Sequence, residues 1–201
     1  MEPYISMLNI NEISGAEFRT AFLCMPEERR SRCELLRSEK DKKLCIAADM
    51  LVRKALLEKY AFREDEIVFE YGEAGKPYLR GNPLYFNISH SGDHAAAVFS
   101  EYENGIDIQK IVPVKKRLMK YFCTPDDIAY IFDDMDPDIV PDILDNEDVL
   151  KRFFEVWTFK EAFCKCSGKG FNSDILRVSF TDAHCYTEHQ NGYVISTVYN
   201  K

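Results

Sequence analysis

Apolar residues in the first half of the chain recur at the spacing of a helix, which predicts one long helix there. The apolar positions are Leu44, Ala48, Leu51, Ala55 and Leu56. Ser38, with Asp41 three residues later, is typical of a helix start, although Glu is more usual than Asp at the second position. We therefore expect a helix from Ser38 to about Tyr60, preceded by a shorter basic helix that opens at Pro26.

In the second half, the apolar pattern predicts a long helix from about Glu147 to Ser167. Gly168 and Gly170 follow it, and glycine commonly ends a helix. Two shorter helices are expected near Val114–Tyr121 and Pro125–Phe132.

Short runs of alternating apolar and polar residues predict strands. They lie at Tyr4–Asn9, Ile67–Tyr71, Leu84–Ile88, Ala95–Ser100, Ile106–Gln109, Leu176–Thr181, Ala183–His189 and Tyr193–Tyr199. Asn104-Gly105 is predicted to be a turn, and we place a domain boundary there, between residues 1–103 and 104–201. The order of strand, helices and strands begins again after it, so the predicted fold class is α+β with two pseudo-duplicated halves.

Charged residues on the second long helix share a face with an aromatic residue. Trp157, Glu161 and Lys165 are four residues apart and so lie close to one side of the helix, with Trp157 expected in the core. Taken alone, Glu161 and Lys165 also fit a solvated ion pair worth roughly 0.2–0.5 kcal/mol. On the preceding strand, alternation sends Asp107 and Gln109 to the same side. Together the two elements predict an oxygen-lined site for a hard cation such as magnesium.

Composition places the chain among ordinary globular proteins, because 201 residues with 46% hydrophobic and 30% charged content suit one large domain or two small ones. No signal peptide is expected at the N-terminus, and no stretch approaches the ~18 apolar residues of a membrane helix. Seven cysteines without a regular framework predict reduced thiols and a cytoplasmic location. Cys164 and Cys166 lack the further ligands that a zinc site requires.

The net charge of −8 comes from one segment. Residues 121–150 contain ten acids and no Lys or Arg, so the rest of the chain has 26 basic and 24 acidic residues. A solvated insert around Pro137 and Pro141 is the simplest interpretation of this segment. Nucleic-acid binding is not expected, because neither a basic aromatic surface nor a known binding motif occurs.

Four sequence blocks occur in an order that is typical of one family. They are Gly75-Lys76-Pro77, Phe86-Asn87-Ile88-Ser89-His90-Ser91, Gly105-Ile106-Asp107-Ile108-Gln109 and the pattern W-x-x-K-E-A-x-x-K from Trp157 to Lys165. With these blocks the chain resembles the 4′-phosphopantetheinyl transferases, in the longer two-domain form that serves peptide and polyketide synthetases. A looser match from Pro26 to Arg53 extends the resemblance over most of the chain. Gln109 departs from it, since many members have Glu there.

The resemblance implies a fold and a reaction. Members of the family have two like halves, each a small, largely antiparallel sheet with a long helix, and the active site lies at their interface. They transfer phosphopantetheine from coenzyme A to a serine of an apo acyl or peptidyl carrier protein and release adenosine 3′,5′-bisphosphate. Breaking a pyrophosphate calls for a metal and fixed cations, and the weak serine nucleophile calls for a base.

By this resemblance, Asp107 and Glu161 are the primary magnesium ligands, and Gln109 is a neutral third ligand or holds a water. Glu161 is also the candidate base, acting directly or through a water, and Lys165 would contact the transferred phosphate. Asp107, Glu161 and Lys165 thus form the expected catalytic set. Lys160 points about 100° away around the helix and would contact another part of the pyrophosphate or form a structural pair. An amide at position 109 should weaken magnesium binding without abolishing it.

The other candidate contacts to coenzyme A lie in the first half: Arg29, Arg32, Lys76, Ser89 and His90. Lys76 is expected beside the adenine and ribose, and Ser89 and His90 can donate to phosphate oxygens. Arg29 and Arg32 match positions that pair with the 3′-phosphate if one residue is inserted near Glu28. Arg30 is the alternative to Arg29 in this alignment.

Five basic residues follow the proposed metal strand: Lys110, Lys115, Lys116, Arg117 and Lys120. Carrier proteins of this family's substrates present an acidic helix beside the modified serine, so these residues are expected to steer that helix to the site. Alternatively, they balance the neighbouring aspartates. A coenzyme A-binding protein without transfer activity and a magnesium-dependent phosphohydrolase remain alternative functions. We expect a monomer that binds neither nucleic acid nor membrane.

Overall fold

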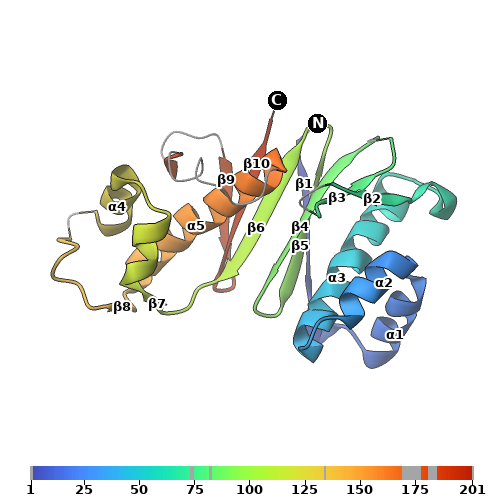
Figure 1. The fold of residues 1–201 in the computed structure, drawn as a ribbon, viewed down its shortest axis with the longest axis horizontal. Coiled ribbons are helices and arrows are strands. Elements are labelled where there is room, and N and C mark those ends of the chain that lie inside the picture. Colours follow the sequence, from blue (N-terminus) through green and yellow to red (C-terminus); the bar gives the residue numbers. More distant parts are fainter. Residues whose placement is uncertain are drawn as a thin grey trace. The chain divides into compact units, whose positions relative to one another are not determined.

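The computed structural model describes residues 2–72, 75–81, 83–133, 135–168, 178–180 and 185–200. Contacts within the chain divide it into two compact units, residues 1–102 and 103–201. Figure 1 labels the helices and strands of both units. Among the described residues, no helix combines the length and the apolar character needed to cross a membrane.

The first unit is built on an antiparallel sheet in the strand order β1-β5-β4. Its elements are β1 (Tyr4–Asn9), η1 (Ile10–Glu12), α1 (Gly15–Cys24), α2 (Glu27–Glu34), α3 (Glu39–Lys54), the π-helical turn η2 (Ala55–Lys59), η3 (Glu64–Glu66), β2 (Phe69–Tyr71), β3 (Pro77–Leu79), β4 (Tyr85–Ser91) and β5 (His94–Ser100). Helix α3 packs on this sheet, and α1 and α2 pack on α3 (Figure 1). Strands β2 and β3 form a separate antiparallel pair.

The long helix of the first unit begins where its sequence predicts. The Ser38 hydroxyl accepts a hydrogen bond from the Asp41 backbone N–H at 3.3 Å, which caps the first turn. Leu44, Leu51 and Leu56 are buried, so the apolar stripe faces the core. The helix runs on to Lys59 through its π-helical turn, which agrees with the expected end near Tyr60.

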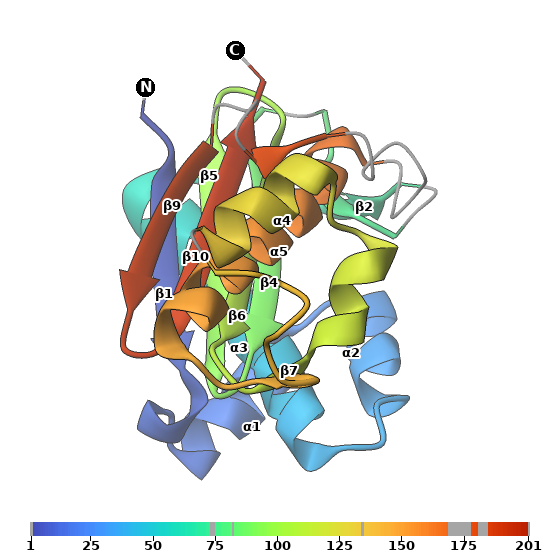
Figure 2. The ribbon, with the colours of Figure 1, turned by 90° about the vertical axis from the view of Figure 1, so that its left-hand side faces the viewer.

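The second unit repeats this plan with an antiparallel sheet in the order β6-β10-β9. Its elements are β6 (Asn104–Lys110), β7 (Val114–Lys115), the 3₁₀ helix η4 (Lys116–Tyr121), α4 (Pro125–Phe132), β8 (Ile143–Leu144), α5 (Glu147–Ser167), β9 (Cys185–Gln190) and β10 (Tyr193–Tyr199). Helix α5 covers β6 and β10, and α4 packs on α5 (Figure 2). Each unit thus has one long helix on a three-stranded sheet, which confirms the α+β fold class.

Two sequence predictions in the second half are wrong. Asn104-Gly105 is not a turn but the start of β6, and 114–121 forms a short strand and a 3₁₀ helix instead of one α-helix. The strands expected at 176–181 and 183–189 fall partly outside the described residues, as do Gly170 and the side chain of Lys120. Within the described part, Val178 and Ser179 are not in a strand, and β9 starts at Cys185.

Candidate active site

Strand β6 and helix α5 bring four of the candidate residues into one group. Asp107 is only 2% exposed, and its carboxylate accepts a hydrogen bond from Gln109 Nε2 at 3.2 Å. The other oxygen of Asp107 lies 2.6 Å from Lys165 Nζ, which also donates to the Ile106 carbonyl at 3.1 Å. The alternation along β6 and the helical spacing on α5 therefore place these side chains as the sequence predicts.

Glu161 completes the group as a half-buried carboxylate. Its pKa is raised, first because burial disfavours the charged form and second because the Asp107 carboxylate repels it. The Lys165 ammonium offsets part of this rise. With both carboxylates ionised, Asp107, Glu161 and Lys165 carry a net charge of −1. An additional cation at this site would therefore be favoured electrostatically.

The donor set fits magnesium in its chemistry. Asp107 and Glu161 supply carboxylate oxygens and Gln109 an amide oxygen, and hard oxygen donors are what this ion prefers. Within the described ranges, no group of three His, Cys, Asp or Glu side chains is placed to hold a metal. The third oxygen donor here would be an amide, so such a site has two charged ligands instead of three.

Gly105 allows β6 and α5 to approach each other closely. A Cβ atom at this position would lie 2.0 Å from the Ala162 carbonyl oxygen and 2.5 Å from the Cys166 backbone nitrogen. Real Cβ contacts are never so short, so no side chain fits unless the helix moves away. The glycine that suggested a turn is thus required by the packing that joins Asp107 to Glu161 and Lys165.

Lys160 lies apart from this group, inside the core of the second unit. Its side chain is 1% exposed and its Nζ contacts Asp127 Oδ2 at 2.6 Å and the Phe122 carbonyl at 2.5 Å. Burial by itself would raise the pKa of Asp127, but hydrogen bonds from Lys160, the Phe180 N–H and the Thr124 N–H outweigh it and lower that pKa. Of the two alternatives for Lys160, the geometry favours the structural pair.

Asp127 was not singled out from the sequence. It belongs to the acidic segment interpreted as a solvated insert, yet it is fully buried and caps α4 through Thr124. The sequence feature that could have identified Asp127 is the run Thr124-Pro125-Asp126-Asp127, which is typical of a capped helix start. Trp157, which was expected in the core, is half-buried and packs against the core of this unit, with its ring centroid 4.7 Å from that of Phe122.

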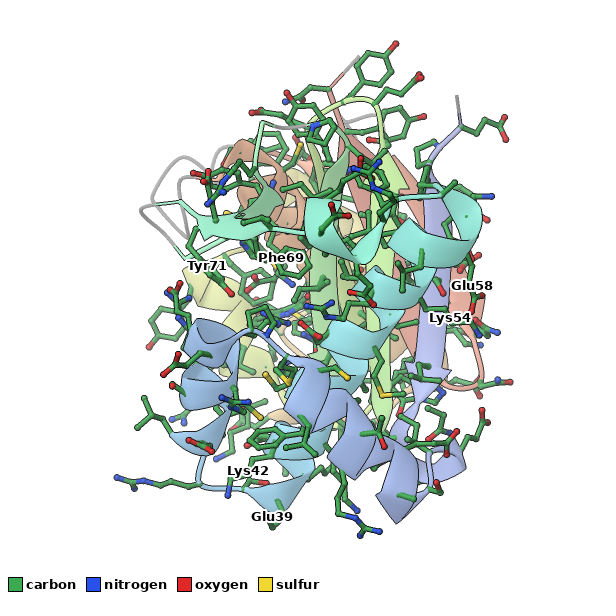
Figure 3. All side chains as sticks on the ribbon, turned by 90° about the vertical axis from the view of Figure 1, so that its right-hand side faces the viewer. Glu39, Lys42, Lys54, Glu58, Phe69 and Tyr71 are labelled. Atoms are coloured by element: carbon green, nitrogen blue, oxygen red, sulfur yellow. The ribbon has the colours of Figure 1, made fainter. Side chains whose placement is uncertain are left out.

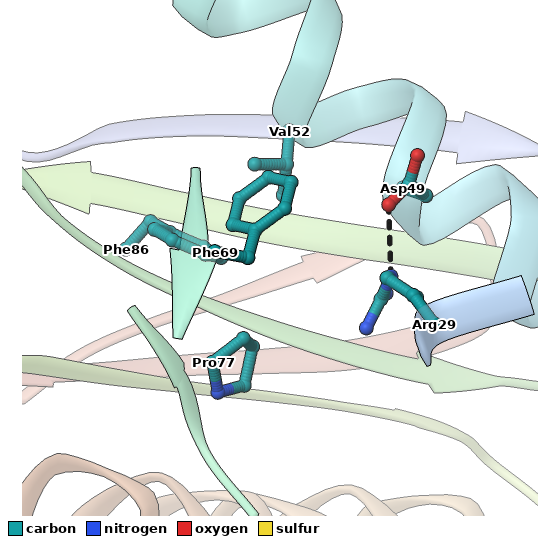
Figure 4. A pocket seen from close by; sticks show the side chains of 6 residues that line it. All are labelled: Arg29, Asp49, Val52, Phe69, Pro77 and Phe86. Carbon is teal, nitrogen blue, oxygen red and sulfur yellow. Dashed lines mark ion pairs between the residues drawn. The ribbon is translucent and has the colours of Figure 1, made fainter. Parts of the chain in front are cut away.

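In the first unit, Arg29 and Arg32 lie on α2 and engage different partners. Arg29 Nε is 2.8 Å from Oδ1 of the buried Asp49 on α3. Arg29 and Asp49 line a small recess together with Phe69, Pro77, Phe86 and Val52, and its volume of about 10 Å³ has room for about one water molecule (Figure 4). Arg32 is half-exposed, pairs with Glu28 at 2.9 Å, and lies 4.0 Å from the centre of the Tyr71 ring. Figure 3 shows Phe69 and Tyr71 side by side on the β2 ribbon.

Lys76 lies just before β3, and Ser89 and His90 lie on β4 of the same unit. Lys76 immediately precedes Pro77 and β3, after a glycine with φ of +77° that turns the chain. Ser89 and His90 are neighbours on β4, so their side chains point to opposite faces, and Ser89 is buried whereas His90 is exposed. Phe86 on the same strand lines the recess beside Arg29.

Comparison with known proteins gives the family. A family profile described as "4′-phosphopantetheinyl transferase, N-terminal" matches residues 12–102, and one described as "4′-phosphopantetheinyl transferase superfamily" matches residues 103–200. The chain is 31% identical over 146 residues to 4′-phosphopantetheinyl transferase psf-1 of Bacillus pumilus, covering 72% of this chain and 58% of the relative.

Two further relatives cover more of this chain. The chain is 29% identical over 170 residues to 4′-phosphopantetheinyl transferase Sfp of Bacillus subtilis, covering 83% of this chain and 68% of the relative. It is 27% identical over 175 residues to the L-aminoadipate-semialdehyde dehydrogenase-phosphopantetheinyl transferase of Xenopus laevis, covering 83% and 57%. The chain therefore spans about three fifths to two thirds of the length of these relatives. Both units match, in order, and the chain belongs to the 4′-phosphopantetheinyl transferase superfamily.

Proposed function

We propose that this protein transfers the 4′-phosphopantetheine group from coenzyme A to a serine of an apo acyl or peptidyl carrier protein. The observation that carries the proposal is the grouping of Asp107, Glu161 and Lys165 on β6 and α5, in which Lys165 pairs with Asp107 and both charges act on the pKa of Glu161. It combines a base with a raised pKa, a buried carboxylate and an ammonium, which is what the transfer of a phosphoryl-linked group requires. Curated relatives named as phosphopantetheinyl transferases support the same reaction.

In the proposed reaction, the serine oxygen attacks the phosphorus next to the pantetheine arm. Glu161 takes the serine proton, since its raised pKa makes it a better base than an ordinary carboxylate. The bond between this phosphorus and the bridging oxygen breaks, and adenosine 3′,5′-bisphosphate leaves with the bond electrons. Lys165 holds the transferred phosphate by moving its ammonium from Asp107 Oδ1 toward the substrate.

Magnesium belongs to this proposal. Asp107 and Glu161 would hold it with charged oxygens, and Gln109 would either add its amide oxygen or orient Asp107 through its present hydrogen bond. When bound, the ion would neutralise charge on the leaving phosphate. Its arrival would also remove the repulsion between the two carboxylates.

Coenzyme A is proposed to contact the first unit through the residues near the recess. Arg29 and Arg32 would bind its 3′-phosphate, and Lys76 would lie beside the adenosine. Ser89 and His90 on β4 would donate to phosphate oxygens. Lys160 is left out of this set, because its ammonium is paired with Asp127 in the interior.

The carrier protein is proposed to dock on the segment that follows β6. Lys115 and Arg117 are exposed there, together with the apolar side chains of Leu118 and Tyr121, of which Tyr121 is 72% exposed. Basic and apolar residues interleaved along β7 and η4 suit an acidic amphipathic helix. The cytoplasm remains the proposed location, since all seven cysteines are free and coenzyme A is the substrate.

The test is transfer onto an apo carrier protein in the presence of coenzyme A and magnesium, measured by intact mass. Asp107→Asn and Lys165→Ala are expected to lower kcat by about 10²-fold or more. Lys151→Ala is the matched control, because Lys151 is a half-exposed lysine on the same helix and pairs with Glu147 at 2.7 Å. Near-parental transfer by Asp107→Asn and Lys165→Ala would contradict the assignment of the site.

A further inference from the structure

We propose that Asp49 is a positioning residue that orients Arg29 toward the 3′-phosphate of coenzyme A. This inference rests on the proposed function and adds to it a residue that does not touch the substrate. Asp49 belongs to none of the four sequence blocks, and only the contacts of its side chain identify it.

Asp49 is a buried carboxylate held between two arginines. It lies on α3 and is 2% exposed. Arg29 Nε is 2.8 Å from Oδ1, and Arg53 Nε donates to Oδ2 at 3.1 Å. A buried carboxylate is unfavourable unless cations compensate its charge, and the two arginines supply this compensation.

The two arginines have different roles in this arrangement. Arg53 is anchored at its far end as well, because its NH1 donates to Glu64 Oε2 at 3.0 Å. Arg53 therefore fixes the carboxylate, and the carboxylate in turn holds Arg29. Oδ1 has no aligned hydrogen bond among the described residues, so it holds Arg29 through a charge contact at 2.8 Å.

Arg29 presents the rest of its guanidinium to the recess. Figure 4 shows a guanidinium nitrogen directed away from Asp49, on the side of Pro77. The recess is otherwise walled by Phe69, Phe86 and Val52, which supply no competing acceptor through their side chains. A guanidinium held from behind by a carboxylate offers its remaining N–H groups to an oxyanion with fixed geometry.

The two arginines of the group cancel Asp49 and Glu64 in net charge, but these charges are unevenly placed. One carboxylate is shared by two guanidinium groups, and Glu64 lies at the outer end of Arg53, away from Arg29. Positive charge is therefore left at the Arg29 end, next to the chain segment that carries Lys76. A phosphate monoester is the ligand that such a site would recognise.

The test compares binding of coenzyme A and of 3′-dephospho-coenzyme A by calorimetry, on the full chain and without carrier protein. The parent protein is expected to prefer coenzyme A. Asp49→Asn is expected to lose about tenfold or more of this preference, while binding of the dephospho compound changes little. Asp41→Asn, an exposed aspartate on the same helix, is the matched control and should keep the preference.

A double-mutant cycle separates positioning from a general structural effect. In an Arg29→Ala background, Asp49→Asn is expected to cause no further loss of preference, because Asp49 acts through Arg29. Equal weakening of both ligands by Asp49→Asn, or an additional loss in the Arg29→Ala background, would overturn the inference. If Asp49→Asn does not fold, Asp49→Ser serves instead, and full retention of the preference would then overturn the inference.

The same titrations distinguish this inference from the function on which it rests. A parent protein that binds neither compound contradicts the proposed function, and it also contradicts the role of Asp49, which depends on that function. A parent protein that prefers coenzyme A and keeps that preference after Asp49→Asn contradicts the role of Asp49 alone.

Discussion

The charges of three side chains decide the chemistry of the site. Burial and the Asp107 carboxylate raise the pKa of Glu161, so the folded protein binds this proton more tightly than the unfolded chain does. The stability that the protonated group contributes is present at low pH and is lost as the pH rises through its folded-state pKa. In the free protein at neutral pH, the repulsion between ionised Glu161 and Asp107 therefore lowers the stability of the fold until a cation or substrate binds between them.

Glu161→Gln should separate stability from activity. Without metal at pH 7, we expect the variant to unfold at a higher temperature than the parent protein, because the repulsion with Asp107 is removed. This difference should shrink as the pH falls toward 4, where Glu161 is protonated. Its kcat should fall by about 10²–10⁴-fold with the loss of the base. Thermal unfolding over a pH series tests the first claim, and an unchanged or inverted pH trend would refute it.

Gln109→Glu should strengthen metal binding and lower the stability of the metal-free protein. The substitution replaces a hydrogen-bond donor to Asp107 by a third carboxylate, so repulsion grows in the absence of metal. We expect magnesium affinity to rise on the order of tenfold, because ligand charge sets affinity for hard cations. Calorimetric magnesium titration, with thermal unfolding in chelator, measures both effects. An unchanged titration would place residue 109 outside the metal site.

At the scale of elements, the packing of α5 on β6 holds the site together. Gly105→Ala would force a Cβ against the backbone of α5, whose nearest atom lies at 2.0 Å. We expect a loss of stability of about 1–3 kcal/mol or more, accompanied by lower activity. Urea unfolding measures the first quantity. Gly15→Ala is the control, since its nearest atom would be a flexible arginine terminus at 3.8 Å. Equal stability of the two variants would contradict the close-packing argument.

The buried pair of Lys160 and Asp127 joins α5 to α4 and to Phe122 after η4. Lys160→Met leaves the Asp127 carboxylate without its cation, and breaking a buried pair in this way costs about 3–5 kcal/mol. Removing both charges in Lys160→Met/Asp127→Leu should restore part of that stability. Equilibrium unfolding of the single and double variants checks this. If Lys160→Met keeps its stability but loses affinity for coenzyme A, Lys160 is a coenzyme A-binding residue and not a structural one.

The sequence predicted the helices whose ends are determined by residues close by in the chain. Ser38 and Asn146 cap their helices, and Gly168 ends α5 with φ of +67°, so both long helices follow from residues that act locally. The role of Gly105 could not be predicted, since it depends on a helix about 60 residues further along the chain. The pairing of Asp127 with Lys160 and of Asp49 with Arg29 was hidden for the same reason: charge in a sequence does not report burial.

At the scale of the whole molecule, the basic segment after β6 should govern recognition of the carrier protein. Arg117→Glu is expected to raise the KM for carrier protein at low salt and to leave that for coenzyme A nearly unchanged. The difference should shrink as salt rises past ~0.15 M, because screening acts on this attraction. Lys54→Glu is the matched control, as it reverses an exposed charge on α3 in the first unit (Figure 3). Equal effects of Arg117→Glu and Lys54→Glu on the KM for carrier protein would show that the docking surface lies elsewhere.

The central claim is that this chain modifies a carrier protein, and one measurement tests it most directly. The protein is incubated with coenzyme A, magnesium and each member of a panel of apo carrier proteins, and the intact mass of every carrier is recorded. We expect at least one carrier to gain the mass of a single phosphopantetheine group, with release of adenosine 3′,5′-bisphosphate, and this gain to be about 10²–10⁴-fold slower after Glu161→Gln. Binding of coenzyme A without any mass gain, or its consumption in the absence of a carrier, would contradict the account.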